Sequence, residues 1–327
     1  MKKYGFNLLW MYAFNEQPYK CVNEKELNFI ADNSFNFIRM PLDYNFWTKD
    51  FDYFNPDEKV LEQIDKYYIE CEKRGLHFCL NLHRAPGYCT NRNELEKHNL
   101  WTDKEALDGF VFLWELFAKR YKGISSSKIS FDLLNEPPCE GLYGLTRDIH
   151  QHVMRTTISA IRAIDPDRDI VLDGLCGGSF AIPELADTGT IHSGRGYMPF
   201  EISHYKASWC GEPNWSEPVY PGVNGPYLWD REALYNHYSP WFEVNKTGTE
   251  IHIGECGCYN KTPNDVALRW LGDLFSVYKE YGWGFALWNF DGPFGIINHG
   301  RPSTKYTQIG DYQVDMELLN IIKNNMI

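Results

Sequence analysis

Short apolar runs alternate with longer amphipathic segments from one end of the chain to the other. The runs are apolar throughout, which is typical of strands buried on both faces of a parallel sheet. The strand candidates are Tyr4–Ala13, Phe35–Pro41, His77–His83, Ile129–Asn135, Ile170–Asp173, Phe200–Tyr205, Ile251–Glu255 and Gly284–Asn289. The intervening segments have apolar residues at helical spacing. The helix candidates include Asp57–Arg74, Lys104–Tyr121, Thr146–Ile164, Asp230–Asn245, Pro263–Tyr281 and Asp315–Lys323.

Eight strand–helix units in 327 residues predict an α/β protein, and they fit a (β/α)8 TIM barrel better than an open, doubly wound sheet. No GxGxxG follows the first strand and no GxxxxGK[ST] occurs, so the nucleotide-binding open-sheet folds lose support. No linker-like segment interrupts the chain, and residues 1–327 are expected to form a single catalytic domain. The Gly- and Pro-rich stretch Ala181–Pro226 is interpreted as loops around the sixth strand.

Composition narrows the possible partners. The formal net charge is −12 without a concentrated basic tract, which argues against binding nucleic acid through its phosphates. No run of 18 apolar residues occurs, so no membrane span is expected. Aromatic residues make up 16% of the chain, and Trp and Tyr faces suit both ordinary cores and the C–H faces of sugars. A neutral glycan is compatible with all of these features.

The nine cysteines form no CxxC pair, which makes a structural zinc site or a redox motif an unfavoured interpretation. Several lie in apolar strands, where Cys behaves as a small hydrophobic residue. Free thiols in this number favour a reducing compartment. The opening MKKYGFNLLW does not resemble a signal peptide. The expected location is therefore cytoplasmic, with secretion as the alternative if a leader preceded this sequence.

Polar residues recur at the carboxyl ends of the predicted strands. In an α/β barrel that edge is where catalytic side chains converge. One polar residue at a strand end usually marks only the point where the strand meets solvent, but the pattern repeats on six strands. The residues are Arg39, His83, Asn135 with Glu136, His204 with Tyr205, Glu255, and Trp288 with Asn289.

Two of these residues, Glu136 and Glu255, supply the carboxyl groups that glycosidic bond cleavage requires. One carboxylic acid protonates the leaving oxygen, and the other carboxylate acts at the anomeric carbon. A separation of about 5 Å between them would mean retention of configuration. The simpler alternative for Glu136 is a cap on the following helix.

The motifs around these residues resemble those of glycoside hydrolase family 5, the cellulase and mannanase family of clan A. LLNEPP resembles its Asn-Glu-Pro motif, and IHIGECG resembles its Gly-Glu motif on the seventh strand; FIRMP, LHRAPG and ALWNFDGPFGI match its second, third and eighth strands. The resemblance covers roughly residues 5 to 300. It implies a retaining enzyme that needs no cofactor and no metal.

The resemblance also assigns roles residue by residue. It implies Glu136 as acid/base, Glu255 as nucleophile, Asn135 on the sugar 2-hydroxyl, and Arg39 beside the nucleophile, where a positive charge would keep it ionised. It implies further sugar contacts in the −1 subsite, where the reacting sugar lies, by His83 and Trp288.

Two departures from the family pattern stand out. Cys256 follows the nucleophile where an aromatic residue is common, which we interpret as a packing change. The sixth strand usually reads His-x-Tyr, whereas this chain has SHYK at 203–206. Either His204 is retained and the tyrosine has moved, or Tyr205 is retained and Ser203 replaces the histidine. We expect both His204 and Tyr205 to line the site.

The leading hypothesis is a β-1,4-glucan hydrolase of the endoglucanase type that acts on β-glucan or a related oligosaccharide. A β-mannanase, a xyloglucanase and an exo-acting β-glucosidase are alternatives on the same scaffold. A non-catalytic sugar-binding barrel would be expected to lack one carboxylate, and both are present. A metal-dependent barrel hydrolase would need an HxH motif on an early strand, and GFNLLWMYA does not contain one.

Overall fold

The structure is a computed structural model that describes residues 2–15, 18–211 and 214–327. Contacts between residues divide the chain into two compact units. The larger unit comprises Leu8–Gly194 and Val244–Glu250, and the smaller unit comprises the residues up to Asn7, Arg195–Glu243 and Ile251–Ile327. Each unit is described below by itself.

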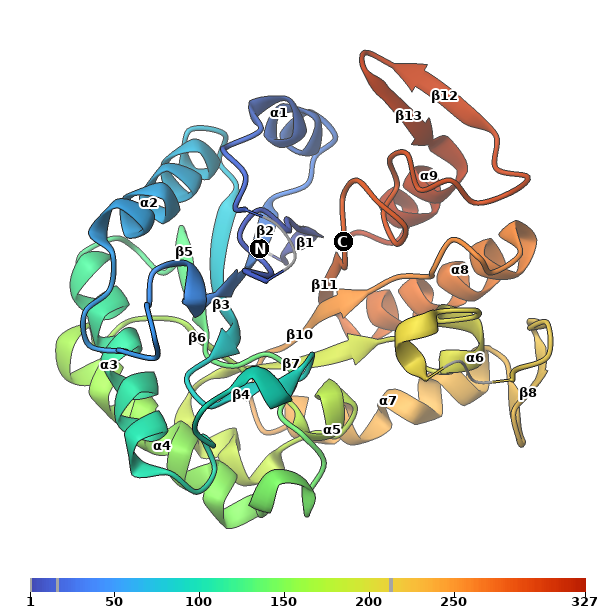
Figure 1. Ribbon diagram of the computed structural model, residues 1–327. Coiled ribbons are helices and arrows are strands. Elements are labelled where there is room, and N and C mark those ends of the chain that lie inside the picture. The colour runs from blue at the N-terminus through green and yellow to red at the C-terminus, as the bar shows by residue number, and fades with distance from the viewer. Residues whose placement is uncertain (1, 16–17, 212–213) are drawn as a thin grey trace. The chain divides into compact units, whose positions relative to one another are not determined.

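A parallel sheet forms the centre of the larger unit (Figure 1). Its strands lie side by side in the order β2 (Phe37–Asp43), β3 (His77–Ala85), β5 (Ile129–Asp132), β6 (Ile170–Asp173) and β7 (Ile191–Gly196, whose last two residues belong to the smaller unit). Parallel pairing places the carboxyl ends of all five strands at one edge. The short strand β4 (Tyr88–Cys89) folds back antiparallel on β3.

Four helices connect these strands and pack on the sheet. They are α1 (Glu24–Asp32), α2 (Glu58–Glu72), α3 (Lys104–Arg120) and α4 (Arg147–Ile164), and a short turn, α5 (Leu175–Gly178), follows β6. Polar caps start three of them, because the side chains of Asn23, Asp57 and Thr146 accept backbone N–H groups of the first turn. The long helices therefore begin within two residues of their predicted starts. Short 3-10 turns lie at Tyr44–Phe46, Asn93–Leu95, Leu142–Gly144 and Pro183–Thr188.

Three parallel strands form the centre of the smaller unit, in the order β1 (Tyr4–Asn7), β11 (Gly284–Leu287) and β10 (Ile251–Cys256). β1 ends at Asn7, well before the predicted Ala13, and the side-chain amide of Asn7 donates to the carbonyls of Gly254 and Leu287, at 3.0 Å each. These two bonds fix the ends of β10 and β11 relative to β1.

The other elements of the smaller unit are helices and two hairpins. The helices are α6 (Phe200–Ser203), α7 (Arg231–Asn245, whose last two residues belong to the larger unit), α8 (Asn264–Tyr281) and α9 (Met316–Asn324), and a 3-10 turn lies at Ser208–Cys210. The hairpins are β8 (Gly222–Asn224) with β9 (Tyr227–Trp229) and β12 (Tyr306–Ile309) with β13 (Tyr312–Asp315).

The predicted sixth strand at Phe200–Tyr205 is wrong. Phe200–Ser203 forms one helical turn after Pro199, and the sixth parallel strand is β7, whose sequence is IHSGRG. This strand begins with its one large apolar residue and is otherwise polar or glycine, so a search for apolar runs does not detect it. All six of its residues are nevertheless buried.

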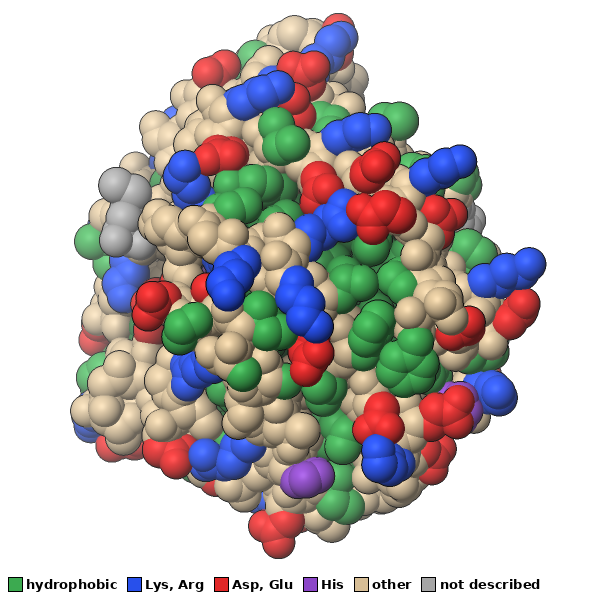
Figure 2. All heavy atoms as spheres, turned by 90° about the vertical axis from the view of Figure 1, so that its left-hand side faces the viewer, with side chains coloured by type: hydrophobic (Ala, Val, Ile, Leu, Met, Phe, Trp, Pro, Cys, Tyr) green, Lys and Arg blue, Asp and Glu red, His purple; other side chains and the backbone are tan. Residues whose placement is uncertain are grey.

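Among the described residues, eight parallel strands (β1, β2, β3, β5, β6, β7, β10 and β11) alternate with helices along the chain. The fold class is the (β/α)8 TIM barrel. No helix within the described ranges is long and apolar enough to cross a membrane. On the face shown in Figure 2, positive and negative side chains are interspersed rather than gathered by sign.

The cysteines differ from expectation in one respect. Cys139 and Cys176 form a disulfide, so not all nine are free thiols. The seven others, all within the described ranges, form no disulfide. The spacing of the cysteines along the chain does not predict this bond, because 37 positions separate the two residues.

Candidate active site

Arg39 is the centre of a buried charge network at the carboxyl edge of the larger unit. It lies on β2, and its Nε donates to Asp132 Oδ2 of β5 at 2.6 Å. Its Nη2 donates to Asn135 Oδ1 at 2.9 Å and lies 3.6 Å from Asp173 Oδ2 of β6. One arginine in the first half of β2 thus connects this strand to the carboxyl ends of β5 and β6, and the two aspartates compensate its charge. Neither Asp132 nor Asp173 was predicted from the sequence.

Asn135 is oriented by this network. Arg39 has only donors, so the atom of Asn135 that faces it is the amide oxygen. The amide nitrogen therefore faces His83 Nε2, at 3.3 Å. Since Asn135 donates to Nε2, the neutral His83 carries its proton on Nδ1. The backbone N–H of Asn135 also donates to the Leu82 carbonyl at 3.0 Å, which fixes the residue beside β3.

Glu136 is half-buried and has an unusual backbone conformation. Its φ is +48°, in the left-handed region that non-glycine residues rarely adopt. Its N–H donates to Asp173 Oδ2 at 2.9 Å, and its carbonyl accepts the Tyr88 hydroxyl at 2.7 Å. Strained backbone of this kind persists where surrounding contacts determine it, and Asp173 and Tyr88 supply such contacts.

Glu255 ends the apolar part of β10 in the smaller unit, and only 3% of its surface is exposed. The Tyr197 hydroxyl donates to its Oε2 at 3.1 Å, and Arg195 Nη2 lies 3.4 Å from its Oε1. Arg195 lies on β7 and Tyr197 directly follows it. Neither residue was predicted from the sequence, because the sixth strand was expected at Phe200–Tyr205 and not at Ile191–Gly196.

Gly196, between these two residues, allows β7 to approach β10 closely. A Cβ atom at this position would lie 2.4 Å from Cys256 Cβ and 2.6 Å from the Tyr278 hydroxyl. Cys256 is itself buried, and its Sγ contacts the Ala286 carbonyl at 3.3 Å. Cys256, the residue after Glu255, therefore packs against Gly196. This close packing explains the small side chain at position 256.

His204 and Tyr205 have different surroundings. His204 Nδ1 lies 2.8 Å from the Ser203 hydroxyl, and its ring meets Tyr197 edge-on at 5.0 Å. Burial lowers the pKa of His204 to about 4, so its ring is neutral near neutral pH. Tyr205 is buried, and its described contact is with the Lys206 ammonium, 4.9 Å from its ring.

Trp288 and Trp209 of the smaller unit are both accessible to solvent. Trp288 directly follows β11, is half-buried, and donates its backbone N–H to the Cys256 carbonyl at 2.8 Å. Trp209 is 57% exposed, and its ring is supported edge-on by Tyr259 at 4.8 Å. Trp229 and Trp241 are buried and offer no such face.

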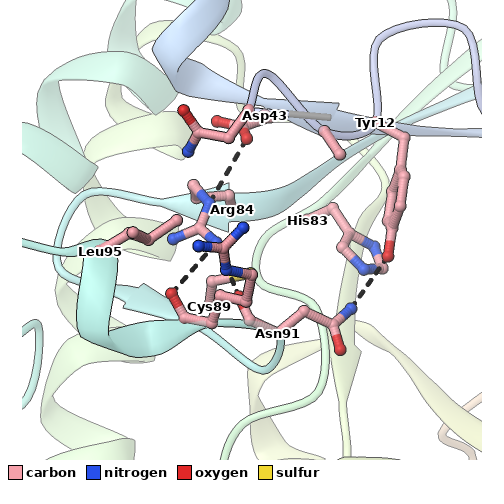
Figure 3. A pocket seen from close by; sticks show the side chains of 10 residues that line it. Tyr12, Asp43, His83, Arg84, Cys89, Asn91 and Leu95 are labelled. Atoms are coloured by element: carbon pink, nitrogen blue, oxygen red, sulfur yellow. Dashed lines mark hydrogen bonds and ion pairs between the residues drawn. The ribbon is translucent and has the colours of Figure 1, made fainter. Parts of the chain in front are cut away.

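A pocket opens beside His83 in the larger unit and encloses about 350 Å³ of empty space, part of it open to solvent. Figure 3 shows the Tyr12 ring next to His83, with Asn91 directed toward the Tyr12 hydroxyl. The two rings are 4.8 Å apart, and Asn91 Nδ2 donates to Tyr12 Oη at 2.9 Å. Asn15 and Arg92 also line the pocket and are exposed.

Arg84 forms the inner wall of this pocket, and its charge is neutralised. It makes ion pairs with Glu96 at 2.6 Å and Asp43 at 3.4 Å, and it donates to the Asn91 carbonyl at 2.6 Å. Burial is the largest influence on Asp43 and raises the pKa of that carboxyl. Burial also raises the pKa of the Cys89 thiol to about 12, which makes it a poor nucleophile. The pocket therefore suits a neutral polar ligand.

The family model for Cellulase (glycosyl hydrolase family 5) matches residues 2–292. The chain belongs to glycosyl hydrolase family 5. Family membership makes it a glycoside hydrolase and agrees with the (β/α)8 fold.

Similar proteins fit this assignment. Cellodextrinase A of Ruminococcus flavefaciens is 27% identical over 80% of this chain and 76% of its own length. Endoglucanase C of Acetivibrio thermocellus is 26% identical over 92% of this chain and 90% of its own. A crystal structure of a glycoside hydrolase is 55% identical, covers 100% of both chains and has a TM-score of 0.98.

Proposed function

We propose that this family 5 hydrolase cleaves β-1,4-linked glucan and its oligosaccharides by double displacement, with Glu255 as the nucleophile and Glu136 as the acid/base. The observation that carries the proposal is the environment of Glu255, a buried carboxylate at a strand end that accepts from Tyr197 and pairs with Arg195. A buried carboxylate without such partners would be strongly unfavourable.

In the first step, Glu255 attacks the anomeric carbon and the glycosidic bond breaks. The nucleophile must point one oxygen at that carbon, and Tyr197 and Arg195 together hold both oxygens in place. Esterification removes the negative charge of Glu255, and the Arg195 charge then favours return of the carboxylate when water releases the sugar. The covalent intermediate and its hydrolysis give retention.

Glu136 delivers a proton to the leaving oxygen in the first step and takes one from water in the second. Its partial exposure suits a group that water must reach. Its backbone N–H and carbonyl are held by Asp173 and Tyr88, respectively, so the carboxyl group starts from a defined position. Arg39 contributes by fixing Asp173 and Asn135.

We further propose that sugar is bound by Asn135, His83, Trp288 and Trp209. Asn135 and His83 form one hydrogen-bonded pair, which presents a defined set of donors and acceptors to sugar hydroxyls. Trp288 and Trp209 offer accessible aromatic faces. The pocket beside His83 adds further polar side chains to this surface, those of Tyr12, Asn15, Asn91 and Arg92. A polar surface of this extent favours an oligosaccharide over a single sugar.

The choice of β-1,4-glucan is supported by the endoglucanase and the cellodextrinase among the similar proteins. The neutralised pocket also argues for an uncharged glycan, since Arg84 is already paired with two carboxylates. A mannanase, a xyloglucanase or an exo-acting β-glucosidase would use the same carboxylates and differ in the loops around them.

Cello-, manno- and xyloglucan oligosaccharides of four to six sugars, supplied separately, test this proposal. We expect cleavage of cello-oligosaccharides at an internal bond, with the β-anomer as the first product seen by NMR. Faster cleavage of manno-oligosaccharides would identify a mannanase, and release of glucose alone an exo-enzyme. An α-anomer as first product would contradict retention.

A further inference from the structure

The disulfide Cys139–Cys176 lies three residues after Glu136. It joins the segment that follows β5 to the turn α5 that follows β6, and both partners belong to the larger unit. Both cysteines are half-buried, so a small reductant can reach the bond. The hydrolytic chemistry proposed above does not use it.

The segment between Glu136 and Cys139 is held in position by hydrogen bonds that its own carbonyl groups accept. Pro137 and Pro138 have no N–H and can donate nothing. Their carbonyls accept from the backbone N–H of Gly177 at 3.0 Å and of Cys176 at 3.3 Å, respectively. The Glu136 carbonyl accepts from Tyr88. Three consecutive carbonyls are thus held, two of them by the turn that contains Cys176.

The turn itself has an unfavourable backbone. Cys176 has a φ of +57°, and Gly177, with a φ of +66°, follows it. A non-glycine residue retains this conformation only where its surroundings hold it. The disulfide supplies such a constraint for Cys176. If the bond opens, the turn can relax toward negative φ, release Pro137 and Pro138, and let the Glu136 backbone move.

We propose that the Cys139–Cys176 disulfide positions Glu136 for proton transfer, so that the hydrolase works best oxidised and loses general acid catalysis on reduction. The inference rests on the proposed function, specifically on Glu136 as the acid. In the reduction, a dithiol supplies two electrons and two protons and closes to its own disulfide. The S–S bond breaks, and each sulfur ends as a thiol.

A comparison of leaving groups separates positioning of the acid from a merely structural effect. Dinitrophenolate needs no protonation, whereas the sugar alcohol leaving from cellotetraose does. We expect Cys139→Ser/Cys176→Ser to lower kcat/KM about tenfold on cellotetraose, because small misplacements of a catalytic group have effects of this order. On dinitrophenyl β-cellobioside kcat/KM should change less than about twofold. Cys21→Ser, which removes an exposed free thiol, is the matched control and should change neither.

Peptide mapping of the unreduced wild-type enzyme should first show Cys139 and Cys176 in one cross-linked pair. If the double variant does not fold, wild-type enzyme treated with dithiothreitol and then reoxidised replaces it, and activity on cellotetraose should fall and return. Equal losses on both substrates, no loss on cellotetraose, or two free thiols in the native protein would overturn the inference.

The outcome is distinct from failure of the proposed function. A wild-type enzyme that cleaves neither substrate contradicts the proposed function whatever the state of the cysteines. A wild-type enzyme that cleaves both substrates, with the same ratio of rates in the variant, leaves the proposed function intact and removes only the disulfide inference.

Discussion

Glu136 is held through its backbone, whereas Glu255 is held through its carboxylate. Glu136 is half-buried and has a backbone with positive φ, whose N–H and carbonyl are held by Asp173 and Tyr88. Glu255 is almost fully buried, with Tyr197 and Arg195 on its oxygens. Two identical side chains in different environments are how one enzyme obtains different carboxyl functions. An oriented, charge-compensated carboxylate suits a nucleophile, and a water-accessible one suits an acid/base.

The largest expected effect is the loss of Glu255. Glu255→Gln keeps the size of the side chain and removes the charge, so we expect kcat on cellotetraose to fall by about 10⁴-fold or more. The variant should remain folded at the assay temperature. Glu250→Gln, at an exposed carboxylate just before β10, is the matched control. Residual activity within tenfold of wild type would remove Glu255 from the mechanism.

Arg39 supports Glu136 indirectly, through Asp173, and a substitution at Arg39 should weaken this support. Arg39→Met leaves Asp132 and Asp173 buried without their shared positive charge, and such a loss costs about 3–5 kcal/mol of unfolding free energy. Urea denaturation measures this cost. Lys104→Met, which breaks an exposed pair with Asp108, should cost no more than about 1 kcal/mol. Equal costs would mean that the Arg39 network does not organise the larger unit.

Two buried histidines of the larger unit should lower the free energy of unfolding as the pH falls. This effect is separate from any protonation of the catalytic carboxylates. Burial lowers the pKa of His150 to about 3 and of His192 to about 4. Above about pH 6.5 both histidines are neutral in the folded and in the unfolded protein, so they do not make the free energy of unfolding depend on pH there. Below it the unfolded chain binds protons that the native state does not, and stability falls until the native pKa values are reached.

From pH 7 to pH 5 this linkage amounts to about 2 kcal/mol for each histidine. Urea denaturation at the two pH values should therefore show a smaller difference for His150→Leu than for wild type. His152→Gln, an exposed position on the same helix, should leave the difference unchanged. An unchanged pH dependence in His150→Leu would show that this side chain is protonated equally in both states.

The smallest effect concerns which tyrosine serves the nucleophile. Tyr197→Phe removes the hydroxyl that orients Glu255, and a hydrogen bond to a charged group is worth about 1.5–3 kcal/mol. We expect kcat/KM to fall about tenfold or somewhat more. Tyr205→Phe should stay close to wild type. The reverse order would restore the sequence-based assignment of Tyr205 to the site.

Much of this arrangement is predictable from sequence, because apolar strands and capped amphipathic helices leave strong local signals. Seven of the eight strands and the positions of Glu136 and Glu255 follow from these signals. The sixth strand does not, since IHSGRG is buried by close backbone approach at Gly196 rather than by apolar side chains. Arg195 and Tyr197 were missed with it.

Asp132 and Asp173 were missed for a different reason. Each ends an apolar strand, where an acidic residue usually marks only the approach to solvent. Their role depends on a single arginine from another strand, and that pairing exists only in three dimensions. The Cys139–Cys176 bond is of the same kind, because two distant loops bring its partners together.

Rescue by azide tests the two assigned roles most directly. With dinitrophenyl β-cellobioside as substrate, Glu136→Ala should form the covalent intermediate and lack the base that hydrolyses it. Azide needs no base, so it should restore turnover and yield the β-glycosyl azide. Glu255→Ala should instead yield the α-glycosyl azide, because azide then replaces the nucleophile. The opposite assignment of the two anomers would reverse the roles of Glu136 and Glu255 and contradict this account.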